Sequence, residues 1–169
     1  RLWALTFVRT SELVGAWWAE FDLEAARWDI PAERMKMRTA HIVPLARQAL
    51  ELLDTLRVLT DNSEWLFPGD RSAAKPMSNN TILKALERIG DKGRMTAHGF
   101  RGLASTILHE QGYAHEHIEL QLAHAPRNSG IEAYNHAVYL MHGPQRMQQA
   151  ADCLDHPQPG AQGVPLWDD

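Results

Sequence analysis

The chain contains 169 residues, of which 44% are hydrophobic, and this is enough for one globular domain with a sizeable core. Its formal net charge of -4 at pH 7 argues against a protein that binds nucleic acid with its whole surface, although a local basic patch remains allowed. The single cysteine, Cys153, excludes an internal disulfide and a multi-cysteine zinc site. No apolar stretch is long enough to span a membrane. We therefore expect a cytoplasmic protein without a membrane partner.

Two short helices are predicted at the start of the chain. Residues 2–8 are apolar enough to be the end of one helix, and Ser11 is a suitable N-cap for the next. Arg9 lies at the joint between them, where rigid neighbours on both sides can direct a long side chain into a cleft. Because the chain begins within the first helix and has no initiator methionine, we expect it to be a fragment of a longer protein.

A small antiparallel sheet is predicted next. Its strands lie within residues 21–30 and 34–45, and in the second segment His41 and Val43 recur at the period of a strand. Lys36 lies near a hairpin of this sheet. A lysine at such a position is commonly a solvated charge that protects an exposed sheet edge, and its function is not decided by its position alone.

Helical periodicity returns in the middle of the chain. The apolar positions of residues 49–59, Leu59 included, mark a helix that faces the core. Residues 65–69 form a short buried run that stops at a turn, and residues 70–77 have the composition of a loop. Ser78 is then expected to cap a further helix.

An amphipathic helix is predicted from Thr96 to Leu108, with Thr96 as its N-cap and Gly112 as its C-cap. His98 and Arg101 are three residues apart and therefore lie on one side of this helix, near its N-terminus. Unpaired backbone N–H groups favour an anion there, so an imidazole and a guanidinium at this place suit a phosphate. The alternative is a surface histidine and a surface arginine that are close by chance.

Two helices and a tail complete the prediction. The segment 115–123 is expected to be a helix that ends at His124, and the residues 125–130 form a loop by their Pro, Asn, Ser and Gly content. Tyr134 lies on the helix that follows, and a separate amphipathic segment is expected after Gly143 and Pro144. We expect one domain over residues 1–155 and a disordered tail over residues 156–169.

Several segments, taken in order, resemble the motifs of one enzyme family. They are TFVRTSEL, IPAERMKMRTAHIVPL, EWLFPG, MSNNTI, TAHGFR, IELQLAHAPRN and IEAYNHA. Together they resemble the catalytic domain of tyrosine recombinases, and specifically of prophage-type integrases, and the resemblance covers nearly the whole chain, from Leu2 to about Leu154. The resemblance implies an α+β, mainly helical fold with a small three-stranded antiparallel sheet. It also implies that N-terminal DNA-binding domains are absent from this fragment.

The residues suit the chemistry of DNA strand exchange. Attack on a phosphodiester builds negative charge on the non-bridging oxygens, and Arg9 and Arg101 offer planar, charge-assisted donors to them. The resemblance implies that Tyr134 is the nucleophile and forms a 3′-phosphotyrosyl link, which conserves the bond energy for religation. By its spacing alone, Tyr134 is more typical of a tyrosine on the apolar face of a helix.

Three further residues receive roles from the resemblance. Lys36 would be the general acid for the departing 5′-oxygen, His98 the proton acceptor for the tyrosine, and His124 a further donor to the phosphate. Without the resemblance, His124 at the end of a helix is more typical of a histidine that interacts with the C-terminal dipole of that helix. Neither a metal nor another cofactor is implied.

The choice of Tyr134 among three tyrosines rests on position. Tyr113 follows the expected helix stop at Gly112 and lies in a connection, whereas Tyr139 is five residues beyond Tyr134 and points about 140° away on a helix. Tyr134 also follows a loop that allows it to swing into a cleft or to withdraw.

The histidines leave a metal site open as another interpretation. His115 and His117 are too close for one helical face, although His109 and a carboxylate such as Glu116 are further candidate ligands. The chain has no HExxH or comparable spacing of metal ligands, which disfavours this reading.

The resemblance thus implies a site-specific DNA recombinase, a prophage integrase that integrates or excises a mobile element. Its expected partners are double-stranded DNA at attachment sites, three further copies in a homotetramer on DNA, and accessory DNA-bending proteins. Two alternatives stay open: a type IB topoisomerase-like enzyme, which cuts and reseals without exchange, and a catalytically inactive DNA-binding or regulatory remnant, which the acidic charge balance favours.

Overall fold

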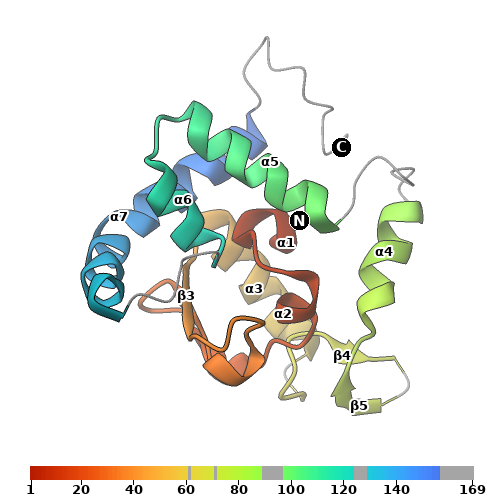
Figure 1. Cartoon of the computed structure of the whole chain (residues 1–169). Helices are drawn as coiled ribbons and strands as arrows, with labels where there is room; N and C mark the ends of the chain where they lie inside the picture. The colour runs from red at the N-terminus through yellow and green to blue at the C-terminus, as the bar shows by residue number, and fades with distance from the viewer. Residues whose placement is uncertain (61, 71, 89–96, 124–128, 157–169) are drawn as a thin grey trace.

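The computed structural model describes five stretches of the chain, with side chains at all their residues except 83, 86, 97, 98, 100 and 129–141. The stretches are residues 1–60, 62–70, 72–88, 97–123 and 129–156. Within them the fold is mainly helical and contains two small antiparallel sheets (Figure 1). This confirms the predicted α+β, mainly helical class.

Helix α1 (Leu2–Thr6) lies at the centre of the molecule, and its five residues are all buried (Figure 1). It ends at Phe7, which takes the left-handed conformation with φ 57°. This conformation is unfavourable for a residue with a side chain, and it reverses the chain before α2 (Thr10–Val14). The indole N–H of Trp3 donates to the carbonyl of Val8 at 2.8 Å and holds the reversal in place.

The two short helices are confirmed, but the predicted N-cap of the second was wrong. Arg9 is the N-cap of α2, and Ser11 lies inside the helix. The Glu12 carboxylate accepts the backbone N–H of Arg9 at 2.8 Å. An ionised carboxylate at the third helical position is a stronger acceptor than a serine hydroxyl, so the helix starts where Glu12 can reach back.

The predicted three-stranded antiparallel sheet is present. Its strands are β1 (Phe21–Asp22), β2 (Arg27–Ile30) and β3 (His41–Pro44), in the order β1-β2-β3. Trp28 pairs with Val43, and Ile30 pairs with His41. Trp28, Ile30 and Val43 are 0–1% exposed. Since paired residues project from the same face of a sheet, His41 stands on the face that is packed against the core.

Helix α3 (Arg47–Thr60) follows as predicted, although Leu59 is 73% exposed instead of facing the core. Leu66 is fully buried, in agreement with the predicted buried run. The next segment was wrongly predicted as a loop, because β4 (Pro68–Gly69) and β5 (Ser72–Pro76) form a hairpin. Most of β5 is exposed, so it carries no alternation of apolar residues from which a strand is recognised.

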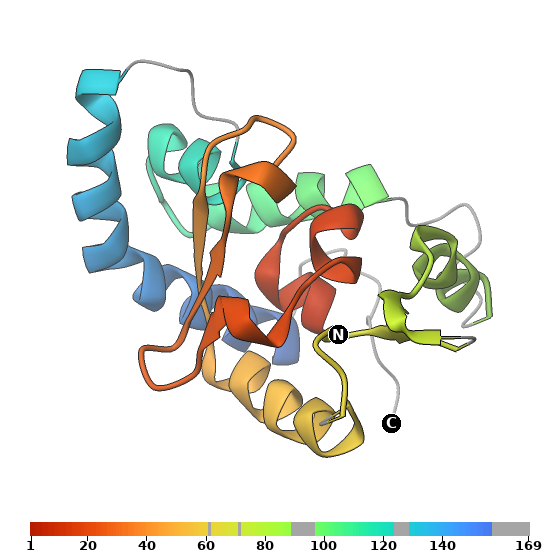
Figure 2. The same cartoon turned by 90° about the horizontal axis from the view of Figure 1, so that it is seen from below.

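Helix α4 (Asn79–Arg88) begins as predicted, since the hydroxyl of Ser78 accepts the backbone N–H of Asn80 at 3.3 Å. With the β4–β5 hairpin, α4 lies on the side of the molecule away from α7 (Figure 2).

Helices α5 (Ala97–Glu110) and α6 (His115–Gln121) confirm two further predictions. Gly112 separates them and has φ 79°, as expected for a C-cap glycine. Helix α6 ends earlier than predicted, with Leu122 as its C-cap. The predicted cap Thr96, residue His124 and the loop after it lie outside the described residues.

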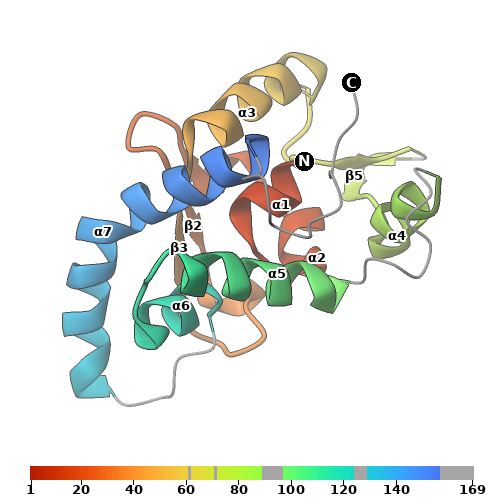
Figure 3. The same ribbon diagram turned by 90° about the horizontal axis from the view of Figure 1, so that it is seen from above.

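Helix α7 (Ser129–Asp155) was predicted as two segments and is one helix that contains Pro144. Figure 3 shows that α7 bends along its length, as expected where proline removes a backbone donor and clashes with the preceding turn. Packing of the second half of α7 against α1 and α5 keeps the helix continuous past the proline. The predicted disordered tail lies outside the described residues from 157 onward. In the described part of the chain, no helix has both the length and the apolar character needed to cross a bilayer.

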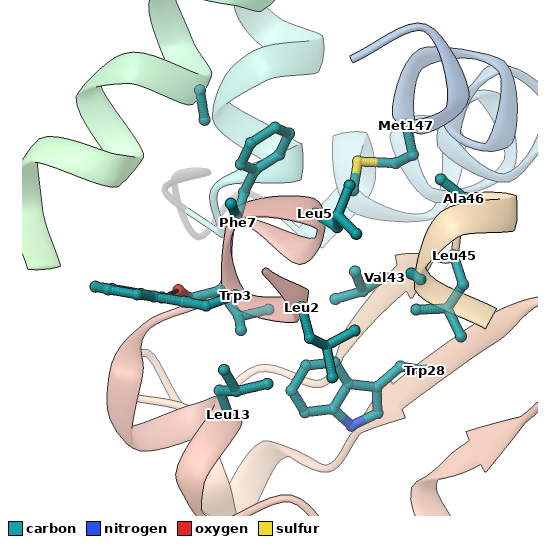
Figure 4. Packing of buried hydrophobic residues seen from close by; sticks show 14 of the residues in the cluster. Leu2, Trp3, Leu5, Phe7, Leu13, Trp28, Val43, Leu45, Ala46 and Met147 are labelled. Carbon is teal, nitrogen blue, oxygen red and sulfur yellow. Dashed lines mark hydrogen bonds between the residues drawn. The ribbon is translucent and has the colours of Figure 1, made fainter. Parts of the chain in front are cut away.

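The main core surrounds α1. Leu5 points toward Met147 of α7, and Leu2 lies over the indole of Trp28 from the sheet (Figure 4). Leu108 of α5 and Ile118 of α6 are also fully buried. The core therefore fixes the α1–α2 joint between the sheet on one side and α5, α6 and α7 on the other.

Candidate functional site

The first candidate residue, Arg9, is held at the α1–α2 joint by a buried carboxylate. Its Nη1 donates to Oε1 of Glu12 at 2.8 Å, while its backbone N–H donates to the other carboxylate oxygen. Glu12 is 2% exposed, whereas the side chain of Arg9 is 22% exposed. Glu12 thus orients the guanidinium of Arg9 from the buried side, and part of the guanidinium stays accessible to an anion.

The second candidate residue, Arg101, lies in α5 and is 8% exposed. Its Nη1 donates to the carbonyl of Phe7 at 3.1 Å, and its Nη2 donates to the carbonyl of Leu122. The left-handed conformation of Phe7 turns that carbonyl toward α5. The guanidinium of Arg101, which belongs to α5, therefore joins the α1–α2 joint to the end of α6.

The two arginines are electrostatic neighbours. The pKa of Arg101 is lowered from 12.5 to about 10, first because the side chain is buried and second because of the like charge of Arg9; Glu12 and Glu119 act in the opposite direction. Arg101 remains charged at neutral pH. Two guanidiniums that lie within electrostatic reach of each other at the joint suit the binding of an oxyanion.

Lys36 lies on the connection between β2 and β3 and is exposed, as its predicted place near a hairpin requires. The base of this connection is fixed on α2, because Arg34 donates to the backbone carbonyls of Glu12 and Gly15. Met35 is 2% exposed and packs into the core. A flexible lysine is thus carried on a connection whose base is anchored on the C-terminal end of α2.

The other three predicted residues are placed only in part. The backbone of His98 lies one turn before Arg101 in α5, and the backbone of Tyr134 lies near the start of α7. The side chains of both residues, and the whole of His124, lie outside the described residues. Their predicted roles therefore remain predictions.

Two residues that lie close to Arg9 and Arg101 were not predicted from the sequence as site residues. Glu12 carries a signal, because an acidic residue three positions after an N-cap is half of a capping box. His41 carries a weaker one, because it shares its strand face with Val43 and is a polar residue where an apolar one is usual. The structure brings His41 near Arg9, Glu12 and Arg101.

The metal-site alternative receives no support from the described side chains. The rings of His109 and His115 stack at 5.6 Å between centroids, but within the described part of the chain no three His, Cys, Asp or Glu residues are grouped closely enough to hold a metal ion.

Comparison with known proteins places the chain in a family. The model of the Phage integrase family matches residues 1–140. Prophage integrase IntZ of Escherichia coli is 48% identical over 92% of this chain and 38% of its own length, and the Integrase of Enterobacteria phage P4 is 43% identical over 92% of this chain and 39% of its own. The chain thus spans about two fifths of the length of these relatives.

The fold has a counterpart among solved structures. The crystal structure of XerA recombinase superposes with a TM-score of 0.62 at 23% identity, over 86% of this chain and 56% of that one. The family match over most of the chain and the high identity to curated integrases agree with the motifs recognised in the sequence. The chain therefore belongs to the phage integrase family.

Proposed function

We propose that residues 1–155 form the catalytic domain of a site-specific DNA recombinase that integrates or excises a mobile element. The observation that carries the proposal is the convergence of Arg9 and Arg101 around the buried Glu12. These arginines come from motifs 92 positions apart in the sequence, and a shared positive site is what a phosphodiester without a metal ion requires. Family membership supports the reaction class.

In the proposed reaction, the Tyr134 hydroxyl attacks the phosphorus and forms a 3′-phosphotyrosyl link, while the bond from phosphorus to the 5′-oxygen breaks. His98 accepts the proton of the tyrosine, and Lys36 gives a proton to the departing 5′-oxygen. Religation runs these steps in reverse, with a 5′-hydroxyl as the nucleophile. Arg9, Arg101 and His124 bind the non-bridging oxygens, whose negative charge grows in the transition state.

Two features of Tyr113 support the choice of Tyr134 as the nucleophile. The hydroxyl of Tyr113 donates to the side-chain carbonyl of Gln149, and the guanidinium of Arg146 lies 5.7 Å from its ring centre. Both partners belong to the second half of α7, so Tyr113 has a structural role between α5 and α7.

The proposed partners are double-stranded DNA attachment sites in the cytoplasm, bound by four copies of the protein with the help of accessory DNA-bending proteins. The acidic net charge of the chain agrees with a division of labour in which the rest of a longer protein contributes much of the DNA affinity.

Covalent trapping tests the proposal. A DNA substrate with a nick beside the cleavage position releases a short strand irreversibly, so the wild-type chain is expected to accumulate a protein–DNA adduct that survives boiling in detergent. Tyr134→Phe should form none, whereas the matched variants Tyr113→Phe and Tyr139→Phe should still form it. An adduct whose peptide maps to Tyr139 would identify a different nucleophile.

Two other outcomes would point to the alternative functions. Relaxation of supercoiled DNA without joining of two sites would indicate a type IB topoisomerase-like enzyme. DNA binding without any adduct would indicate an inactive remnant.

A further inference from the structure

His41 is a polar residue on the core side of the small sheet. It begins β3 and pairs with Ile30, which is 1% exposed, and two residues later on the same face Val43 is fully buried. His41 is itself half-buried. A histidine at such a place needs a hydrogen-bond partner to compensate for its lost hydration.

That partner is the end of α6. The ring of His41 donates to the backbone carbonyl of Gln121, the last residue of this helix. The next carbonyl, that of Leu122, accepts from Arg101. Carbonyls in the last turn of a helix have no acceptor role inside the helix, so His41 and Arg101 together satisfy two successive carbonyls at this C-terminus.

His41 also faces the charged residues of the candidate site. The pKa of His41 is lowered from 6.5 to about 4, chiefly because the ring is buried; the positive charges of Arg101 and Arg9 lower it further, while the carboxylate of Glu12 and the hydrogen bond to the Gln121 backbone raise it. The ring is therefore neutral at cellular pH. It donates its hydrogen bond without adding a third positive charge beside the two guanidiniums.

We infer that His41 is a positioning residue of the recombination site: the hydrogen bond from its ring to the Gln121 carbonyl holds the end of α6 against Arg101 and fixes the direction of the Arg101 guanidinium. The inference rests on the proposed function for the role of Arg101. The clamp itself, in which β3 and α5 bind adjacent carbonyls of α6, stands on contacts that do not depend on that role.

The chemistry of position 41 is tested by replacing the ring with donors of different reach. Asn carries its N–H₂ where Nδ1 of histidine stands, and Gln carries its own where Nε2 stands. One of the variants His41→Asn and His41→Gln therefore restores the hydrogen bond, whereas His41→Ala removes it. Ile30→Val is the matched control, because it loosens the packing beside His41 without removing a polar group.

The first measurement is the single-turnover rate of adduct formation on saturating nicked DNA. His41→Ala is expected to lower this rate about 10- to 100-fold, the loss that follows when a catalytic group is misplaced by about 1 Å. The DNA dissociation constant should stay unchanged, since His41 is not expected to contact DNA. One of the two amide variants should recover most of the rate, and Ile30→Val should cleave like the wild type.

The second measurement does not need catalysis. In NMR spectra of the chain without DNA, the exchange rate of the Nε proton of Arg101 reports how firmly its guanidinium is held. His41→Ala should accelerate this exchange about tenfold or more, and the amide variant that rescues cleavage should slow it again. The indole proton of Trp28, which donates to Glu20 at 2.9 Å in the same core, is the internal reference and should not change.

The outcomes separate the inference from the proposed function. If the wild type forms no adduct, the proposed function fails, and the exchange of the Arg101 proton still decides whether His41 positions that side chain. If Arg101 and Trp28 lose protection together in His41→Ala, or if neither amide variant restores the Arg101 signal, His41 only stabilises the fold and the inference is overturned. Wild-type cleavage by His41→Ala would overturn it as well.

Discussion

At the scale of single residues, the site depends on guanidinium groups whose geometry is fixed by backbone carbonyls and one carboxylate. Arg101 uses two nitrogens on two carbonyls that belong to different parts of the chain, which only a planar group with several donors can do. Arg9 likewise uses its side chain and its backbone on the two oxygens of Glu12. The Arg101 arrangement uses two separate guanidinium nitrogens, and the single ammonium nitrogen of a lysine does not reproduce this fork.

Arg101→Lys is therefore expected to abolish most DNA cleavage while the domain stays folded at 25 °C. Loss of charge-assisted hydrogen bonds to the Phe7 and Leu122 carbonyls should also lower the free energy of unfolding by about 1–3 kcal/mol. The checks are the adduct assay, the circular dichroism spectrum and urea unfolding. Near-normal cleavage by this variant, with an unchanged spectrum, would contradict the assignment of Arg101 to the phosphate.

The lowered pKa of His41 predicts a pH-dependent stability. The folded-state pKa of about 4 lies below the unfolded value of 6.5, so the unfolded chain binds more protons between these values. The contribution of His41 is thus fully present above pH 6.5 and is lost as the pH falls toward 4. The expected loss is on the order of 2 kcal/mol, because the partial exposure of the ring reduces the full linkage value.

Urea unfolding at pH 4.5 and pH 7 measures this effect. Because the pKa of His117 is also lowered by burial and shifts stability in the same direction, the wild type must be compared with His41→Gln. The variant should lose less stability on acidification than the wild type. Equal losses in the two proteins would show that His41 titrates normally.

At the scale of elements, polar side chains join helices that are distant in the sequence. The side-chain carbonyl of Gln148 on α7 accepts the backbone N–H of Arg47 at 2.9 Å, and its amide donates to Gln48 at 2.9 Å. Gln48 in turn donates to Asp152 at 2.9 Å. The start of α3 is thus capped by α7 rather than by a neighbouring serine or threonine, since the residue before the helix is Ala46.

Gln148→Ala should therefore destabilise the domain by about 1 kcal/mol, the typical effect of removing a helix N-cap. Gln145→Ala is the matched control, since Gln145 lies on the same helix and is exposed. Thermal unfolding of both variants measures the difference. If both variants unfold at the wild-type temperature, the contact between α3 and α7 does not stabilise the fold.

At the scale of the whole molecule, charge limits how this chain meets DNA. The formal net charge of -4 confines positive potential to local sites such as the Arg9–Arg101 pair, so few phosphates are neutralised on binding. Since the salt dependence of binding scales with the number of phosphates neutralised, the isolated chain is expected to bind DNA weakly, with a shallow dependence on salt concentration and little sequence preference. Fluorescence anisotropy at several salt concentrations measures this. Nanomolar, sequence-selective binding at physiological salt would contradict the expectation.

Much of the secondary structure and the family could be predicted because both depend on local information. The cap at Ser78, the stop at Gly112 and the three strands are encoded by neighbouring residues, and the integrase motifs are continuous segments. Two helix boundaries were nevertheless predicted wrongly. At α2 a competing local signal decided, because the carboxylate of Glu12 places the N-cap at Arg9. At α7 packing against other elements carried the helix past Pro144.

By itself, the sequence predicted most of the helices, the three-stranded sheet and the family, and it suggested the two arginines as site residues. Only the tertiary structure decided which groups hold those arginines. The carbonyl that accepts from Arg101 belongs to Phe7, 94 positions away, and His41 reaches Gln121 from a strand that no local pattern relates to α6. Such contacts depend on how whole elements pack, and packing is set by the shape of a shared core, not by the spacing of residues along one segment.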